Sequence, residues 1–266
     1  MYKTAGLFIG LNYINCDPKL QLQGCIKDVN NLATLLQQKT NMTSVTVITD
    51  ESNPNQTTKQ GIIHSITRFA DYCNSTSIDL AWIHYSGHGS RRFDTNKDEL
   101  DGKDECIVPW DFQQAGFLVD DEINELLRLF KRPTMRIVCV FDSCHSGTVC
   151  DVPFSWNIKN KKCTRENKNN FSIQQSKVIA ISGCLDNQVS YDTLNGGIMT
   201  TNLVATLTEN FAKYTADIFE LVKRLQERVG KKQTILLTSS FNLMEGASLF
   251  PKSFPTSRIR IRHSRR

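Results

Sequence analysis

Residues 78–89 are IDLAWIHYSGHG, an apolar run that breaks off into a polar, glycine-rich turn. Residues 136–147, RIVCVFDSCHSG, repeat this arrangement further along the chain. Short apolar runs bounded by such turns are typical of buried strands in parallel sheets. In open α/β sheets, ligands gather at the carboxyl ends of the strands. The sequence therefore predicts that His88 and Cys144, each just past the end of a strand, meet at one edge of a sheet.

Apolar runs alternate with amphipathic helical patterns along most of the chain. Besides the two strands above, we expect strands at 5–11, 45–49, 177–182 and 234–238, helices at about 26–39, 57–73, 120–130, 199–211 and 216–229, and a polar loop before the helix at 120. This alternation predicts an α/β fold with a mostly parallel central sheet and helices on both faces. The last part has too few strands for a sheet of its own, so one sheet should span the domain.

Composition narrows the class of protein. The 266 residues are 39% hydrophobic and 22% charged, as in ordinary globular domains, and the net charge is +5. Residues 252–266 hold six basic residues and no acid, which leaves the rest of the chain close to neutral, so no nucleic-acid partner is expected. We expect no membrane partner either, because no apolar run approaches the roughly 20 residues of a membrane span. No signal peptide is recognised and the nine cysteines lack zinc-binding spacings, which favours a reducing, cytoplasmic location.

The apolar pattern disappears between residues 151 and 176. Cations lie there among asparagines, namely Lys159, Lys161, Lys162, Arg165 and Lys168. We interpret this segment as an exposed basic linker. It would join residues 1–150, which carry the candidate reactive side chains, to residues 177–266, which complete the same domain and end in the basic tail.

Cys144 and His88 are candidates for a nucleophile and its base. A cysteine attacks as the thiolate, and an ordinary thiol pKa near ~8.5 means that it needs a base or a positive neighbour. His84 is the rival base, but a histidine within a strand is more often a packed core residue. Gly89 and Gly147 permit close backbone approach, which is useful where N–H groups face a developing oxyanion. The pattern indicates a cysteine hydrolase.

These segments resemble those of the metacaspases, caspase-like cysteine peptidases. The resemblance rests on residues 85–89 (YSGHG) and 142–147 (DSCHSG), with support from 24–28 (GCIKD), 104–105 (DE), 109–111 (PWD), 119–122 (VDDE) and 182–184 (SGC), followed by Asp186, Gln188 and Ser190. It implies a caspase-like three-layer fold with His88 and Cys144 as the catalytic dyad. Backbone N–H groups of Gly89 and Cys144 would hold the oxyanion. The match is to type I relatives without their prodomain.

The resemblance also implies a specificity pocket lined by Cys25, Asp28, Ser86 and Asp142. Two carboxylates can pair with a guanidinium or an ammonium group, so protein or peptide substrates should carry Arg or Lys before the scissile bond. True caspases take Asp and need a basic pocket, which these positions do not supply.

Four further aspartates match positions that bind calcium in the family: Asp104, Asp120, Asp121 and Asp151. Hard oxygen ligands in this number suit Ca²⁺. The sequence thus predicts a monomeric, calcium-activated endopeptidase that cleaves after Arg or Lys and can cut its own basic linker. A calcium-independent, paracaspase-like peptidase and a non-catalytic scaffold or aggregate-binding protein on the same fold are the alternatives.

Overall fold

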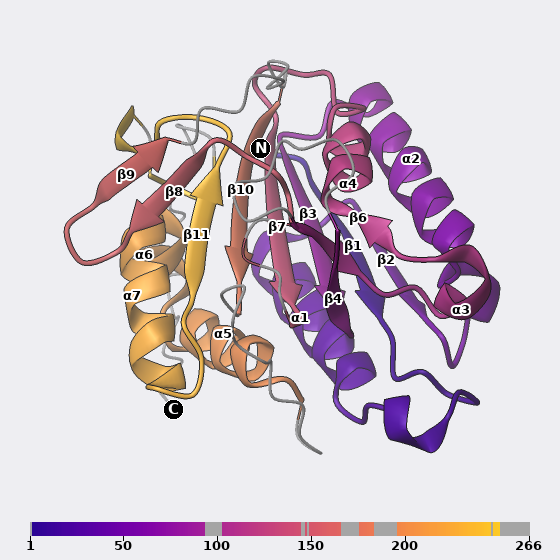
Figure 1. Cartoon of the computed structure of the whole chain (residues 1–266). Helices are drawn as coiled ribbons and strands as arrows, with labels where there is room; N and C mark the ends of the chain where they lie inside the picture. The colour runs from indigo at the N-terminus through magenta and orange to yellow at the C-terminus, as the bar shows by residue number, and fades with distance from the viewer. Residues whose placement is uncertain are drawn as a thin grey trace, which may run out of the picture.

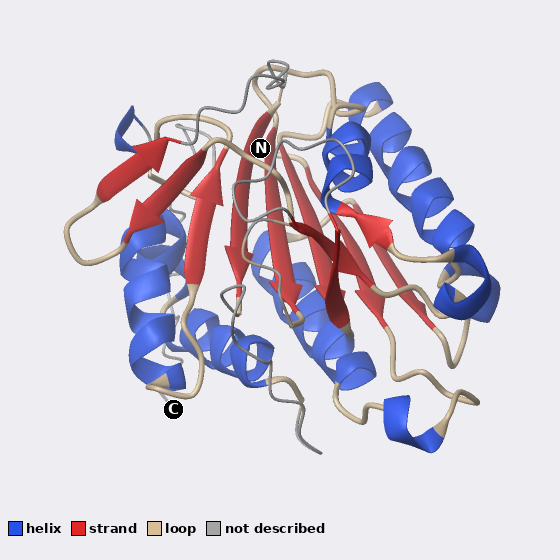
Figure 2. Cartoon of the chain, in the orientation of Figure 1, coloured by secondary structure: helices blue, strands red, loops and turns tan. Residues whose placement is uncertain are grey.

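The central sheet is mostly parallel and runs across the whole domain (Figures 1 and 2). The computed structural model describes residues 2–93, 103–144, 147, 149–165, 176–183, 196–245 and 247–250. In this part of the chain the strand order is β2 (Ser44–Thr49), β1 (Thr4–Gly10), β3 (Leu80–Ser86), β7 (Arg136–Asp142), β10 (Lys177–Ser182), β11 (Leu236–Ser239), β8 (Phe154–Asn157) and β9 (Lys162–Arg165). The first five are parallel, and the last three pair antiparallel.

Each face of the sheet carries a hydrophobic core of its own. Strand β1 supplies both, because Leu7 and Ile9 point into one core and Phe8 into the other, as the period of two requires. Helices α2 (Lys59–Ser75) and α4 (Asp120–Leu127) cover the first face, and α1 (Cys25–Thr40), α5 (Ile198–Glu209), α6 (Phe211–Ala216) and α7 (Ile218–Val229) cover the second (Figure 1). The predicted α/β fold with helices on both faces is confirmed.

Helix α1 packs directly against β1, and Gly10 leaves room for this contact. A Cβ atom at Gly10 would lie 2.7 Å from a methyl carbon of Val29 and 2.8 Å from the carbonyl oxygen of Cys25. Asn12, just past β1, accepts from the backbone N–H of Cys25 at 3.0 Å and so caps the start of the helix. The first turn of α1 is therefore held directly against the carboxyl end of the sheet, where the candidate site lies.

A second, antiparallel sheet replaces the polar loop that we expected before residue 120. It consists of β4 (Gly89–Phe93), β5 (Lys103–Ile107) and β6 (Leu118–Val119), and the short helix α3 (Phe112–Ala115) lies between β5 and β6. Ion pairs connect Arg91 to Glu105 and Arg92 to Asp104, each at 3.4 Å and each across the β4–β5 ladder. Charged cross-strand pairs stabilise a ladder without an apolar alternation, so the sequence pattern gave no sign of these strands.

The prediction of a linker without secondary structure is wrong for residues 154–165. They form the β8–β9 hairpin at the end of the sheet. Trp156 is buried, packs edge-on against Phe219 with ring centroids 5.5 Å apart, and donates from Nε1 to Ser239 Oγ at 2.8 Å. Phe154 and Ile158 pack against the same core, so the apolar period of two is present at 154, 156 and 158, but it is too short to stand out beside the lysines and asparagines that follow. Lys159, Lys161, Lys162 and Arg165 are exposed as expected, whereas Lys168 lies outside the described residues.

Two other expectations fall outside the described residues: the segment with Asp186, Gln188 and Ser190, and the basic tail.

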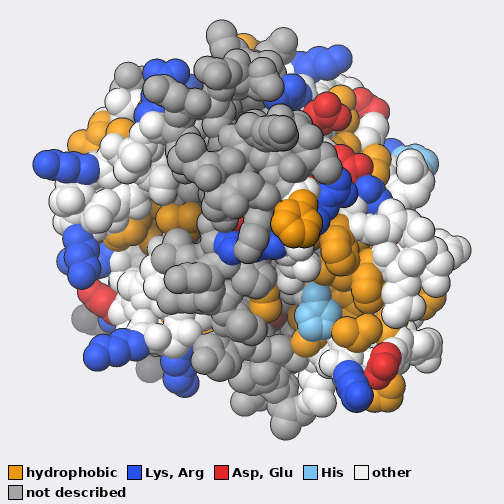
Figure 3. Space-filling model, viewed as in Figure 1, with side chains coloured by type: hydrophobic (Ala, Val, Ile, Leu, Met, Phe, Trp, Pro, Cys, Tyr) orange, Lys and Arg blue, Asp and Glu red, His pale blue; other side chains and the backbone are white. Residues whose placement is uncertain are grey.

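No helix of the described part is long and apolar enough to cross a membrane. On the face drawn in Figure 3, the described Lys and Arg side chains are scattered, some at the border and some near the middle, with acidic side chains between them.

Candidate active site

His88 and Cys144 follow neighbouring strands by the same number of residues. Strands β3 and β7 are parallel, and their register places Ser86 opposite Asp142. His88 and Cys144 each come two residues after this pair, and the backbone N–H of Gly87 bonds to the carbonyl oxygen of Asp142 at 3.3 Å. The structure thus brings the two segments side by side at the carboxyl edge of the sheet, as predicted.

Gly89 lets these two segments approach closely. A Cβ atom at this position would collide with the carbonyl oxygen of Cys144 and would lie 3.2 Å from its backbone nitrogen. The backbone nitrogens of the two predicted oxyanion donors, Gly89 and Cys144, therefore belong to segments in direct contact. Any side chain at Gly89 would separate them, so the glycine is a geometric requirement of this edge.

The imidazole of His88 is oriented by a backbone carbonyl. Its Nε2 lies 2.8 Å from the carbonyl oxygen of Leu20, in the turn between β1 and α1. A carbonyl oxygen only accepts hydrogen bonds, so Nε2 carries the hydrogen and the neutral ring keeps Nδ1 as its basic nitrogen. The ring of Tyr13 packs against the imidazole with centroids 4.6 Å apart. His88 is thereby held in one tautomer and supported on one face.

Sequence reasoning missed Leu20 and Tyr13 as parts of this site. The contribution of Leu20 is a main-chain carbonyl, which any residue could supply, so no side-chain pattern could have revealed it. Tyr13 gave no sequence signal either: its backbone has a positive φ of 56°, which is uncommon for a non-glycine residue and marks a sharp change in chain direction. That change follows from the fold and is not visible in the sequence.

His84 is a core residue and no rival to His88, as predicted. Its side chain is fully buried in β3, and Nδ1 lies 3.2 Å from the carbonyl oxygen of Val140. Burial lowers the pKa of His84 to about 3, because the charged imidazolium would lose its hydration. The ring therefore stays neutral at neutral pH.

His84 should make folding stability depend on pH below neutrality. Between pH 6.5 and about 3 the unfolded chain protonates His84 while the native state does not, so stability present above pH 6.5 is lost as the pH falls. The free energy of unfolding should decline with a slope approaching ~1.4 kcal/mol per pH unit from this residue. Urea unfolding of wild type and His84→Gln between pH 6.5 and 5 measures it. The variant should show the shallower slope, whereas His64→Gln, at an exposed position of α2, should match wild type; equal slopes in wild type and His84→Gln would contradict the assignment.

The predicted specificity residues gather beside the dyad. Asp28, in the first turn of α1, is 1% exposed, and Asp142, at the end of β7, is 5% exposed. Ser86 donates from Oγ to Asp28 Oδ2 at 2.9 Å, and Cys25 is buried at the first position of α1. The structure therefore brings Asp28, Ser86 and Asp142 together, and Cys25 lies in the same turn of α1 as Asp28.

The start of α5 holds the two carboxylates. The backbone N–H of Gly197 donates to Asp28 Oδ2 at 2.9 Å, and that of Thr200 donates to Asp142 Oδ2 at 2.8 Å. A Cβ atom at Gly197 would collide with Asp142 and would lie 3.0 Å from Asp28 Oδ2. The carboxylates thus converge on one glycine, and each accepts a hydrogen bond from a backbone N–H at the start of α5.

The four predicted calcium residues come from three segments around α4. Asp104 on β5 and Asp120 at the start of α4 are buried, whereas Asp121 and Asp151 are partly exposed. Asp120 accepts from the backbone N–H of Glu105 at 3.0 Å and from that of Asp121 at 2.9 Å. These contacts attach the start of α4 to β5.

Asn124 links the same helix to the chain beyond Cys144. Its Nδ2 donates to the carbonyl oxygens of Cys150 and Asp151 at 3.0 and 2.9 Å. The three segments therefore lie together, although no three His, Cys, Asp or Glu side chains of the described residues are grouped as a metal site. The donor set suits a hard cation, which would have to draw these carboxylates closer.

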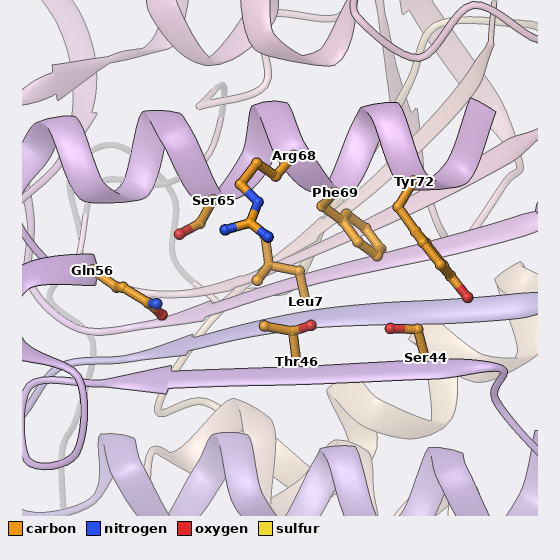
Figure 4. A pocket seen from close by; sticks show the side chains of 8 residues that line it. All are labelled: Leu7, Ser44, Thr46, Gln56, Ser65, Arg68, Phe69 and Tyr72. Carbon is orange, nitrogen blue, oxygen red and sulfur yellow. The ribbon is translucent and has the colours of Figure 1, made fainter. Parts of the chain in front are cut away.

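A cavity lies elsewhere in the fold, at the outer edge of the sheet between β2 and α2 (Figure 4). It encloses about 330 Å³ and is lined by Leu7, Ser44, Thr46, Gln56, Ser65, Arg68, Phe69 and Tyr72. These side chains offer hydroxyl, amide and guanidinium groups over an apolar floor, but no thiol or imidazole. The candidate active site is therefore at the carboxyl edge of the strands and not in this cavity.

The fold is that of the caspase class, as solved structures indicate. The chain is similar to a protein from Geobacter sulfurreducens, with a TM-score of 0.64, 25% identity and coverage of 90% of this chain and 93% of the other. It is also similar to caspase-1 from Spodoptera frugiperda, with a TM-score of 0.60, 13% identity and coverage of 91% and 87%.

Sequence comparison narrows this class to one family. The family model of the metacaspase, peptidase C14 domain, matches residues 4–153. Metacaspase-1A of Aspergillus fumigatus is 40% identical over 156 residues, which are 57% of this chain and 37% of the relative. Metacaspase-1 of Yarrowia lipolytica is 32% identical over 245 residues, covering 74% of this chain and 52% of the relative. The chain belongs to the metacaspase family, and it spans about a third to a half of the length of these relatives.

Proposed function

We propose that the protein is a cysteine endopeptidase with His88 and Cys144 as its dyad. The observation that carries the proposal is the register of β3 and β7, which sets both residues the same distance beyond a hydrogen-bonded pair of strands. The bond from Nε2 of His88 to Leu20 leaves Nδ1 as the ring nitrogen that can take a proton. Membership in a family of peptidases supports the same assignment.

The chemistry follows from these groups. Nδ1 of His88 takes the proton of the Cys144 thiol, and Sγ attacks the scissile carbonyl carbon. Backbone N–H groups of Gly89 and Cys144 stabilise the oxyanion that forms. The amine leaves with the proton held by His88, and a thioester remains. Water then attacks the thioester while His88 accepts its proton, the bond between the carbonyl carbon and Sγ breaks, and His88 returns the proton to Sγ as the carboxylic acid departs.

Asp28 and Asp142 support a preference for Arg or Lys before the scissile bond. Both are buried, both lie against Gly197, and Asp142 is only two residues from the nucleophile. A guanidinium or ammonium group entering beside them would gain two charged acceptors. An Asp side chain of a substrate would meet like charges, which makes caspase specificity unfavourable.

Calcium would act on the candidate active site indirectly, through carboxylates that belong neither to the dyad nor to the specificity pocket. Asp104, Asp120, Asp121 and Asp151 would hold the ion, and its charge would offset their mutual repulsion. It would draw together β5, α4 and the turn at residues 150–151, six to seven residues after Cys144. That turn is already attached to α4 through Asn124.

Calcium dependence should be lost when this cluster loses a carboxylate. Wild type should require calcium at about 10⁻⁴–10⁻³ M, because scattered carboxylates without a preformed cage bind it weakly. Asp120→Ala should raise the required concentration at least tenfold, whereas Asp71→Ala, at an exposed position of α2, should not. Calcium titration of peptide hydrolysis measures both. Full wild-type activity in a chelator, or an unchanged response in Asp120→Ala, would refute the site.

Self-cleavage and a monomeric state complete the proposal. Exposed cations of the β8–β9 hairpin offer cleavage sites, and we expect cutting there to be incidental to activity.

The hairpin covers β11, and the new edge strand β9 is short, exposed and carries Lys162 and Arg165. These features disfavour pairing with a second copy. Cytoplasmic location stays a prediction.

Hydrolysis of fluorogenic peptides tests the proposed function. Matched peptides ending in Arg, Lys or Asp, assayed with and without calcium, should show cleavage of the first two only and only with calcium. No hydrolysis of any peptide by folded protein would contradict the peptidase assignment, and cleavage of the Asp peptide would contradict the acidic pocket.

A further inference from the structure

Two buried tyrosine hydroxyls enclose the main chain of His88. The Tyr13 hydroxyl accepts from the His88 backbone N–H at 2.9 Å, and the Tyr85 hydroxyl donates to the His88 carbonyl oxygen at 2.8 Å. The two hydroxyl oxygens lie 3.2 Å apart, and both side chains are at most 1% exposed. Burial raises the pKa of both phenols, so both remain protonated donors.

The hydroxyl of Tyr13 lies at the end of the β4–β5 ladder, between His88 and Val108. The backbone N–H of Val108 donates to the His88 carbonyl at 3.1 Å, so a regular antiparallel ladder would return a bond from the His88 N–H to the Val108 carbonyl. That N–H instead bonds to Tyr13 Oη, which donates to the Val108 carbonyl at 2.7 Å. The inserted hydroxyl separates the strands at His88 while satisfying both backbone groups.

This arrangement also directs the N–H of Gly89. Gly89 pairs with Ile107, the position next to His88 and Val108, and alternation of the ladder makes this a non-hydrogen-bonded pair. The carbonyl of His88 and the N–H of Gly89 belong to one planar trans peptide and point in opposite directions. Tyr85 and Val108 hold that carbonyl toward β5, so the Gly89 N–H points away from β5. A donor on the carbonyl also polarises the peptide and strengthens its N–H.

Gly87 provides the space for this pair of hydroxyls. A Cβ atom at Gly87 would lie 2.6 Å from Tyr85 Oη and 3.2 Å from Tyr13 Oη. The glycine between Ser86 and His88 thus allows both hydroxyls to reach the chain.

We propose that Tyr13 and Tyr85 are positioning residues, Tyr13 for the imidazole of His88 and Tyr85 for the oxyanion-binding N–H of Gly89. This inference rests on the proposed peptidase function. Tyr13 acts through its contact with the imidazole ring and its bond to the His88 N–H. Tyr85 acts through the peptide that joins His88 to Gly89.

Two reactions of Cys144 separate these roles. Peptide hydrolysis needs both the base and the oxyanion donor, whereas alkylation by iodoacetamide displaces iodide from a carbon atom and forms no oxyanion. Tyr85→Phe should lower kcat about 10–100-fold, with KM within twofold, and leave the rate of Cys144 alkylation within twofold of wild type. Tyr13→Phe should lower both kcat and the alkylation rate at pH 7 about tenfold or more. Mass spectrometry of the Cys144 peptide gives the site-specific rate.

Tyr214→Phe is the matched control, because Tyr214 is also buried and donates its hydroxyl to Glu209 on the opposite side of the sheet. It should change neither rate, and thermal unfolding of all three variants shows that each is folded. The inference is overturned if Tyr85→Phe slows alkylation as much as hydrolysis, or if either site variant hydrolyses peptides within twofold of wild type. If wild type hydrolyses no peptide, the proposed peptidase function is wrong, and this outcome is distinct from a failure of the roles assigned to Tyr13 and Tyr85. The alkylation rate then still decides the role of Tyr13, and a shift of the Gly89 amide resonance in Tyr85→Phe decides that of Tyr85.

Discussion

Cys144→Ala is expected to lower kcat/KM for Arg-ended peptides by at least about 10⁴-fold, and His88→Ala should have an effect of similar size. A nucleophile and its base act as a unit, so losing either removes the covalent pathway. The double variant should therefore be little worse than either single one. Hydrolysis of fluorogenic peptides at saturating calcium measures these rates.

Matched variants separate this loss from damage to the fold. Cys163 lies exposed on β9 and His64 exposed on α2, so Cys163→Ala and His64→Ala should retain activity within twofold. Circular dichroism and thermal unfolding should show all variants folded. Near-normal turnover by folded Cys144→Ala would exclude this cysteine as the nucleophile.

Asp142→Asn should lower kcat/KM for Arg and Lys peptides by about 10²–10³-fold. The substituted amide keeps an oxygen that can accept from the Thr200 N–H, so the start of α5 stays in place, but the bound cation loses a charged partner. Asp28→Asn should act in the same direction. Rates for matched Arg, Lys and Gln peptides distinguish a loss of charge recognition from a loss of catalysis.

The Gln peptide is the internal standard in this comparison. Its slow hydrolysis should change little in Asp142→Asn, because no cation enters the pocket. Asp79→Asn is the matched carboxylate control, since Asp79 lies before β3 at the opposite end of the strand. Equal losses for Gln and Arg peptides would mean that Asp142 serves the reaction and not the choice of substrate.

The sequence predicted the sheet and the position of its reactive edge because both depend on local patterns. Residues 80–86 and 136–142 are apolar enough to be buried on both faces, and the turns after them contain glycine. Gly89 could be singled out for the same reason. The β4–β5 ladder was missed because charged cross-strand pairs stabilise it and leave no apolar period. The β8–β9 hairpin was missed because its apolar alternation, at Phe154, Trp156 and Ile158, is short and lies beside a basic, polar stretch.

The candidate site was predictable where its chemistry resides in side chains. Asp28 and Ser86 are distant in sequence, and the resemblance implied that they line one pocket; the structure joins them by a hydrogen bond. The Leu20 carbonyl and the Gly197 N–H were not predictable, because main-chain groups leave no trace in residue identity. Tyr13 was missed because its role depends on a positive φ that places its hydroxyl between two strands.

Covalent trapping of Cys144 tests the central claim most directly. Wild type in calcium would be treated with an Arg-ended peptidyl fluoromethyl ketone, and with an Asp-ended one as comparison, and its intact mass and peptide map recorded. The account predicts one adduct per chain, located on Cys144, formed with the Arg reagent and greatly slowed in His88→Ala. An adduct on another cysteine, faster reaction of the Asp reagent, or unchanged labelling in His88→Ala would contradict it.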